Sequence, residues 1–214
     1  MKTDELIAAL ARYPTPVDPA RSQRTLLWAV LGGALGGLAL LVGTLGLSPA
    51  LRVEAASAPM FWLRLAFVAS TALLGWALLR RLAQPNRSAG WPAALLGLPA
   101  AIVWLVALAS LASAGAVERG SLWLGTSWLA CPFRIAAYSL PAFVLLMVAL
   151  RSLAPTRLRQ AGAAAGLAAG AVGACVYQLY CPELAAAFIG TWYVLGMLIP
   201  AAVGAWAGPR MLRW

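Results

Sequence analysis

Two cysteines, Cys131 and Cys181, are the side chains in this sequence best suited to chemistry, and each is followed directly by a proline. Thiols form disulfides in oxidising compartments, and thiolates bind soft metal ions. Three interpretations stay open on these residues alone: a structural disulfide, a reactive or soft-metal-binding thiol pair, and a coincidence of packing. Arg134 follows Cys131 within one helical turn and is expected to favour its thiolate. The third cysteine, Cys175, lies among small apolar residues, so we expect it to be a packing residue.

Other catalytic chemistry has little support in the composition. The sequence contains no histidine, which removes the usual general base and the commonest metal ligand. Two thiolates without histidine suit a soft, thiophilic ion better than a closed zinc site. The six carboxylates lie outside the long apolar segments, which argues against a proton-coupled transporter with an acid at mid-membrane. We therefore expect no catalytic residues and no enzymatic activity.

The elements that must position the cysteines are membrane helices. Of the 214 residues, 63% are hydrophobic and 10% are charged, whereas soluble domains average about 25% charged residues. Uncharged stretches of roughly 20 residues are candidates for transmembrane helices. The sequence predicts an all-α, polytopic membrane protein, a bundle of six transmembrane helices over residues 25–47, 60–79, 91–112, 132–150, 161–180 and 184–207.

Small residues predict how two of these spans pack. The first span contains Gly32, Gly33, Gly36 and Gly37, two overlapping GxxxG patterns that allow close contact between helices. We expect this span to pack inside the bundle rather than to self-dimerise. The fifth span is built mostly from alanine and glycine, so we expect it to lie centrally with neighbours pressed against it.

The distribution of basic residues predicts the orientation. Of the 16 lysines and arginines, 12 lie in the N-terminal segment, in the loops after spans two and four, and in the C-terminal tail. The positive-inside rule places this side and both termini in the cytoplasm, and it places Cys131 and Cys181 on the outer side. Arg64, near the outer start of span two, is expected to extend its side chain to the interface. The net charge of +10 is thus attributed to membrane orientation and not to nucleic-acid binding.

The polar N-terminal segment predicts a short cytoplasmic amphipathic helix followed by an extended, proline-rich linker. An interfacial helix lying on the membrane and a docking helix for a cytoplasmic partner are equally supported by this pattern. The expected segments are 1–24 for helix and linker, 25–207 for the transmembrane domain, and 208–214 for a cytoplasmic basic tail. The helix is defined by Thr3 as its cap, Asp4 and Glu5 in its first turn, the apolar stripe Leu6, Ile7, Leu10 and Tyr13, and the terminating prolines Pro14, Pro16 and Pro19.

The order and spacing of several segments resemble one protein family. They are MKTDELIAALA, CPFRIAAYSLPAF, LRSLAPTRLRQAGAAAGLAAGAVGA, YCPELAAAF and WYVLGMLIPAAVGAWAGPRMLRW. Together they resemble the negative regulator of sigma F family, six-span anti-sigma factors of the bacterial inner membrane that are also catalogued as a domain of unknown function. The resemblance covers nearly the whole chain. It departs at Tyr180, where we expect a histidine, and this departure argues against a metal-ligand role for that position.

The resemblance implies a function that composition does not show. A member of this family would hold an extracytoplasmic-function sigma factor inactive at the cytoplasmic face of the inner membrane. Cys131 and Cys181 would sense heavy metals or oxidants on the outer side and trigger release. No resident cofactor is implied, only a transient soft metal ion at the cysteine pair. The sigma-factor contact would then be the N-terminal helix, through Thr3, Asp4, Glu5, Leu6, Ile7 and Leu10.

The alternative function is a small-molecule transporter or channel. Pro99, Pro141 and Pro200 lie where they would break spans three, four and six near mid-membrane, as transporter helices often are broken. The absence of buried acids and of a clear inverted repeat argues against this alternative.

Overall fold

The computed structural model describes residues 19–46, 58–85 and 87–213. The predicted N-terminal helix and its proposed contact residues lie outside this part of the chain. The described residues are helical and contain no strand, and six stretches are long and apolar enough to cross a membrane. This confirms the predicted all-α class and its six spans. The helices are α2 (Pro19–Thr44), α4 (Pro59–Leu82), α5 (Trp91–Leu95), α6 (Leu98–Ser113), α7 (Ala116–Leu124), α8 (Cys131–Arg151), α9 (Leu158–Tyr177), α10 (Ala186–Phe188), the π-helix η2 (Ile189–Tyr193) and α11 (Val194–Met211).

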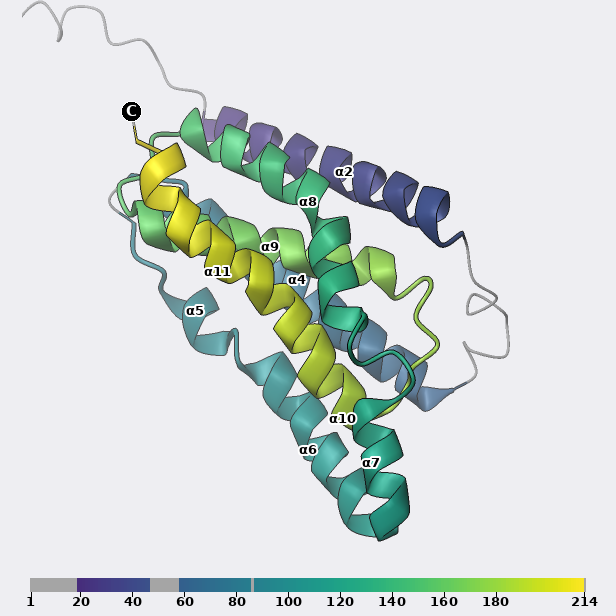
Figure 1. Cartoon of the computed structure of the whole chain (residues 1–214). Helices are drawn as coiled ribbons and strands as arrows, with labels where there is room; N and C mark the ends of the chain where they lie inside the picture. The colour runs from purple at the N-terminus through teal and green to yellow at the C-terminus, as the bar shows by residue number, and fades with distance from the viewer. Residues whose placement is uncertain (1–18, 47–57, 86, 214) are drawn as a thin grey trace, which may run out of the picture.

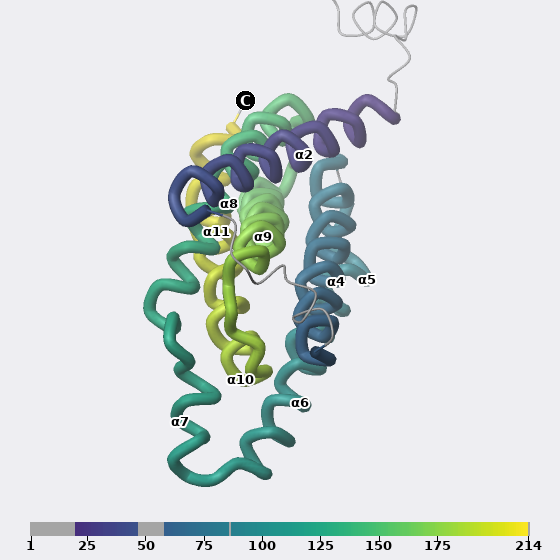
Figure 2. The backbone as a smooth tube through the Cα atoms, turned by 90° about the vertical axis from the view of Figure 1, so that its right-hand side faces the viewer, coloured from purple at the N-terminus to yellow at the C-terminus, as the bar shows by residue number. Residues whose placement is uncertain are grey.

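The α9 helix forms the centre of the bundle, as its alanine and glycine content predicts. It packs against α2, α4, α8 and α11 (Figures 1 and 2). Its glycines lie directly against the backbones of these neighbours: a Cβ atom added at Gly162 or Gly166 would overlap the carbonyl groups of Gly204 or Pro200 in α11. A Cβ atom at Gly173 would come within 2.5 Å of the carbonyl oxygen of Ile135 in α8. Without hydrogen as the side chain, these helices could not approach so closely.

The glycines of α2 pack against α8, so the GxxxG patterns serve contacts inside the bundle, as expected. A Cβ atom added at Gly33 would overlap Ala142, and one at Gly37 would lie 2.6 Å from the carbonyl oxygen of Tyr138. In the middle of α8 lies Pro141, which removes a helical hydrogen bond, and the helix bends near its middle (Figure 1).

The ends of the first and last spans differ from the prediction. The α2 helix begins at Pro19 and not at Thr25, because proline is well accommodated in the first turn of a helix. At the other terminus α11 continues to Met211 and Leu212 is buried, so residues 208–211 are helical, and the cytoplasmic tail from residue 208 stays a prediction. The Leu212 side chain packs into the bundle instead of extending into water.

Only one of the three predicted proline breaks is found. The third span is divided between α5 and α6, directly before Pro99, which lies in the first turn of α6. By contrast, Pro141 and Pro200 lie inside helices that continue past them. The broken-helix pattern that favours a transporter is therefore weaker than the sequence indicates.

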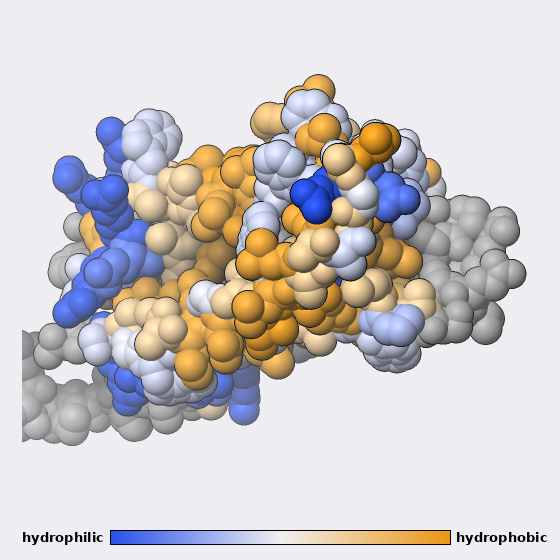
Figure 3. Space-filling view, turned by 90° about the horizontal axis from the view of Figure 1, so that it is seen from below, coloured by the Kyte–Doolittle hydropathy of each residue, from blue (hydrophilic) through white to orange (hydrophobic). Residues whose placement is uncertain are grey.

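The bundle has two distinct ends. One buried cluster joins the start of α2, the ends of α4, α8 and α11 and the start of α9, so these termini lie together. We call this the basic end, and Figure 3 shows a large group of hydrophilic residues at one end of the molecule, with a smaller group toward the other end and apolar residues between them. Apolar side chains on the sides of the bundle, such as Leu35 and Leu73, are 68% and 69% exposed, as expected for contact with lipid. The arginines of the basic end are Arg21, Arg24, Arg80, Arg81, Arg87, Arg151, Arg157, Arg159, Arg210 and Arg213.

We expect Gly166→Val to destabilise the bundle by about 1–3 kcal/mol or more, because the added side chain must push α9 and α11 apart. Gly43→Val is the matched control, since among the described residues no atom beyond the local backbone of α2 lies within 4 Å of a Cβ at Gly43. The measurement is the apparent melting temperature of each purified variant in detergent, followed by circular dichroism. Similar losses in the two variants would show that α9 and α11 do not depend on this close approach.

Candidate functional site

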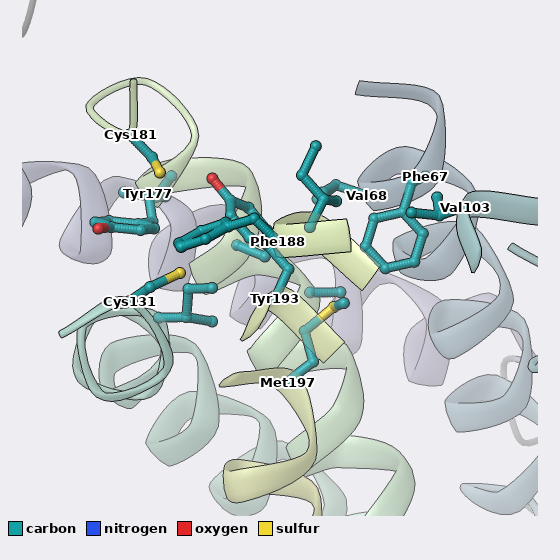
Figure 4. Close-up of a cluster of buried hydrophobic side chains, with 14 of the residues drawn as sticks. Phe67, Val68, Val103, Cys131, Tyr177, Cys181, Phe188, Tyr193 and Met197 are labelled. Carbon is teal, nitrogen blue, oxygen red and sulfur yellow. The ribbon is translucent and has the colours of Figure 1, made fainter. Parts of the chain in front are cut away.

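The two predicted cysteines meet at the end of the bundle opposite the basic end. Cys131 is the first residue of α8, and Cys181 lies in the loop of residues 178–185 that follows α9. Because α8 and α9 are joined at the basic end, their other ends carry the two cysteines side by side. Both are fully buried, and their side chains point into one cluster (Figure 4). Backbone hydrogen bonds fix both positions, from Cys131 to the carbonyl of Ser127 (2.9 Å) and from Cys181 to that of Tyr177 (3.0 Å).

The two thiols are free and interact directly. Their sulfur atoms face each other inside the buried cluster (Figure 4), and each thiol influences the charge of the other. Aromatic rings surround them: Tyr177 packs against Tyr193 with ring centroids 6.1 Å apart, and Phe188 lies in the same cluster (Figure 4). A pair of thiols in such contact can be oxidised to one disulfide or can supply two thiolate ligands.

The groups around Cys181 favour a negative charge on its sulfur. This residue lies outside the spanning helices, and its pKa is lowered from 9.0 to about 6. The hydrogen bond from Cys131 is the largest cause, and burial opposes it by raising the pKa. The Tyr193 hydroxyl, the backbone N–H of Glu183 and the charge of Arg64 lower the pKa further. The Tyr193 hydroxyl is buried and makes no hydrogen bond of ordinary geometry to the described residues.

Arg64 contacts the Cys181 loop, which the sequence interpretation did not predict. It was expected to reach the interface, but it is only 2% exposed and its guanidinium turns into the protein. Its Nη1 atom donates to the carbonyl oxygens of Cys181 (2.8 Å) and Glu183 (2.9 Å), and Nη2 donates to that of Gln178 (3.3 Å). Arg64 and Cys181 are 117 residues apart in the sequence, and no motif connects them.

The other predicted residues of this site hold different positions. The guanidinium of Arg134 lies over the ring of Tyr180, 5.8 Å from its centroid. Its expected tuning of the thiols stays a prediction. Cys175 is partly buried in α9 and packs against the same apolar cluster, as expected for a packing residue.

The segment before Cys131 is fastened to the loop that carries Cys181. The Glu183 carboxylate accepts hydrogen bonds from the backbone N–H (2.8 Å) and the hydroxyl (2.6 Å) of Thr126. Gly125 precedes it with φ +56°, and a Cβ atom there would lie 2.8 Å from the Glu183 carboxylate. Trp192, in η2, donates from its indole to the carbonyl oxygen of Trp123 (2.9 Å). These contacts complete the wall around the thiol pair, and none of them was apparent from the sequence.

The site supplies few ligands for a metal ion. Within residues 19–46, 58–85 and 87–213, no group of three or more His, Cys, Asp or Glu side chains is arranged to hold one. Closed zinc sites use four ligands, whereas Cys131 and Cys181 provide two. The pair therefore fits a soft ion held by two thiolates, or a disulfide that requires no further ligand.

Comparisons with known proteins find relatives over the full length of the chain. The family described as "Negative regulator of sigma F" matches residues 10–214. The "Probable anti-sigma-F factor NrsF" of Azospira oryzae is 45% identical over 218 aligned residues, and the alignment covers 100% of both chains. The "Anti-sigma-F factor NrsF" of Caulobacter vibrioides is 38% identical over 226 aligned residues, again covering 100% of both chains. No solved structure matches the chain.

We expect alkylation of Cys181 by a maleimide to rise with pH around a midpoint near about 6, because only the thiolate reacts. Cys131→Ala removes the thiol that donates the hydrogen bond, so the midpoint moves to higher pH. Cys131→Ser keeps a donor and moves it less. The full chain is alkylated, and mass spectrometry of its peptides then measures the midpoint. Midpoints are compared instead of reaction rates, because burial slows alkylation in all three proteins. Equal midpoints would contradict the hydrogen bond between the two thiols.

Proposed function

The chain belongs to the negative regulator of sigma F family, and from this premise we propose that it is a membrane-bound anti-sigma factor. It would hold an extracytoplasmic-function sigma factor inactive at the cytoplasmic face of the membrane. Two relatives that align over their full length are named anti-sigma-F factors, which supports a sigma factor as partner and a regulatory, non-enzymatic role. The six apolar spans support a multi-pass membrane protein.

The proposed orientation places the basic end in the cytoplasm of a bacterial inner membrane, with both termini on that side. The arrangement of ten arginines at this end supports it through the positive-inside rule. The thiol pair then faces the periplasmic side, where oxidants and metal ions arrive. A sigma factor on the inner face and a signal on the outer face would thus be separated by the length of the spans.

The proposed signal is oxidation of the Cys131–Cys181 pair or its capture of a soft heavy-metal ion. The observation that carries this proposal is the burial of two free thiols, facing each other, in one cluster. Either event would change how the ends of α8 and α9 pack, and both helices continue to the basic end. A coupling of about 1–3 kcal/mol between the two ends would change sigma-factor occupancy severalfold or more.

The alternative, a small-molecule transporter or channel, is less well supported. Among the described residues, the carboxylates Glu118 and Glu183 lie outside the six spans, so no acid is available at mid-membrane there. Spans four and six continue through their prolines. Solute flux in proteoliposomes would favour this alternative over the regulatory role.

Replacing both cysteines, Cys131→Ser with Cys181→Ser, is expected to abolish the transcriptional response to an oxidant or soft metal while the protein still inserts. Cys175→Ser is the matched control, because that thiol lies in α9 and has no cysteine partner. The readout is a reporter under the sigma factor, together with the amount of protein in membranes. Normal induction in the double variant would overturn the sensing proposal.

Deletion of residues 1–13 is expected to release the sigma factor without a signal, because it removes the proposed contact residues Thr3, Asp4, Glu5, Leu6, Ile7 and Leu10. Co-purification of the sigma factor with membranes measures retention. A paired variant that keeps the helix but carries Leu6→Asp and Leu10→Asp tests the apolar stripe alone. Unchanged retention in both proteins would place the contact surface elsewhere.

A further inference from the structure

We propose that Arg64 is the positioning residue of the thiol pair, because its hydrogen bonds to the Cys181 loop hold that loop against the start of α8. This inference deepens the proposed function, on which it rests for the biological use of the pair. Through these hydrogen bonds, α4 sets the position of Cys181 relative to Cys131.

The loop around Cys181 depends on a side chain for its hydrogen bonding. Residues 181–185 form no regular secondary structure, and of their carbonyl groups that of Ala185 accepts a helical hydrogen bond, from the N–H of Ile189 (3.0 Å). Arg64 bonds to the carbonyls of Cys181 and Glu183, on both sides of Pro182, and to that of Gln178 at the end of α9. Proline has no N–H to donate, which leaves this turn with one backbone donor fewer. One guanidinium therefore fixes both ends of the thiol-bearing turn.

Arginine suits this task better than any other side chain. Its planar group presents five donors in a fixed arrangement, and three of the hydrogen bonds observed here use its two terminal nitrogens. Burial of a charge is costly unless it is satisfied by hydrogen bonds, and Arg64 is 2% exposed. A side chain that only reached for the interface would remain exposed. The observed burial indicates a specific structural demand at this position.

The remaining contacts of Arg64 anchor it to a rigid element. It lies in α4, an uninterrupted helix of 24 residues, and its guanidinium lies 5.9 Å from the ring centroid of Phe61 one turn earlier. The same helix packs against α9. A Cβ atom added at Gly75 in α4 would lie 3.5 Å from the Cα atom of Ala168 in α9. The Cys181 loop is thus held from α4, while Cys131 belongs to α8. The two cysteines therefore lie side by side only when α4 and α8 hold their observed positions relative to each other.

The test measures how strongly the two thiols are held together, through their equilibrium with glutathione. In this reaction the two thiols give two electrons and two protons to oxidised glutathione, forming one Cys131–Cys181 disulfide and two molecules of reduced glutathione. The equilibrium constant reports the effective concentration of one thiol at the other. It does not depend on how quickly a reagent reaches the buried site. The full chain in detergent with Cys175→Ala is the parent protein.

Arg64→Met, which keeps length but removes the donors, is expected to lower this effective concentration about tenfold, since disordered reacting groups lose the advantage of proximity. Arg64→Lys keeps a charge and fewer suitably placed donors, and it is expected to recover part of the loss. Arg119→Met is the matched control: it removes an arginine from the same end of the bundle, one whose exposed guanidinium donates to the carbonyl oxygen of Ala114 (3.1 Å). That control is expected to stay within about twofold of the parent.

The outcomes separate the inference from the proposed function. An unchanged equilibrium in Arg64→Met, or an equal loss in Arg119→Met, would overturn the role of Arg64. Circular dichroism shows whether Arg64→Met folds. If it does not, the glutathione equilibria of Arg64→Lys and Arg64→Gln are compared with that of the parent. Two folded variants with the equilibrium constant of the parent would overturn the role of Arg64. A tenfold loss in Arg64→Met combined with normal induction in the cysteine double variant would retain the role of Arg64 and reject thiol sensing.

Discussion

The close approach of α9 to its neighbours is the constraint on which the rest of the structure depends. Glycines such as Gly166 and Gly173 place the backbone of α9 directly against those of α11 and α8. Because α8 and α9 are antiparallel and in contact along their lengths, the start of one must lie beside the end of the other. The meeting of Cys131 with Cys181 is therefore set by residues deep inside the bundle, and the thiol end inherits its geometry from them.

Polar groups at the thiol end obey a second constraint, the need to satisfy irregular backbone at the edge of an apolar environment. Arg64 supplies hydrogen bonds to one side of the Cys181 loop, and Glu183 joins the other side to Thr126. The π-helix η2 adds a wide turn at this point in the sixth span, and Tyr193 at its end is buried beside Cys181. Such single turns of π-helix are frequently found at functional sites. The site is thus assembled from α4, α8, η2 and two loops.

The sequence predicts the spans and their packing well, because hydropathy and small residues report directly on burial in lipid and on helix contact. It is less accurate at helix ends: α2 begins at Pro19, where an extended linker is expected, and α11 continues to Met211, beyond the expected end of the sixth span at residue 207. The cysteine pair was accessible to reasoning through topology alone. The side chains around it were not. Hydrogen bonds such as Arg64 to Cys181 join residues 117 positions apart, and hydropathy carries no information about where such a side chain points.

The complete burial of both thiols has a consequence for timing. A reagent in the surrounding medium can attack only while the wall formed by the loop, η2 and the segment before α8 is briefly open, so the observed rate is the intrinsic rate multiplied by the open fraction. An opening that costs about 2.8 kcal/mol leaves about one molecule in a hundred reactive at any moment. Short pulses would pass with little effect, and sustained exposure would accumulate. The enclosed pair would then behave as a dosimeter, responding to the product of concentration and time.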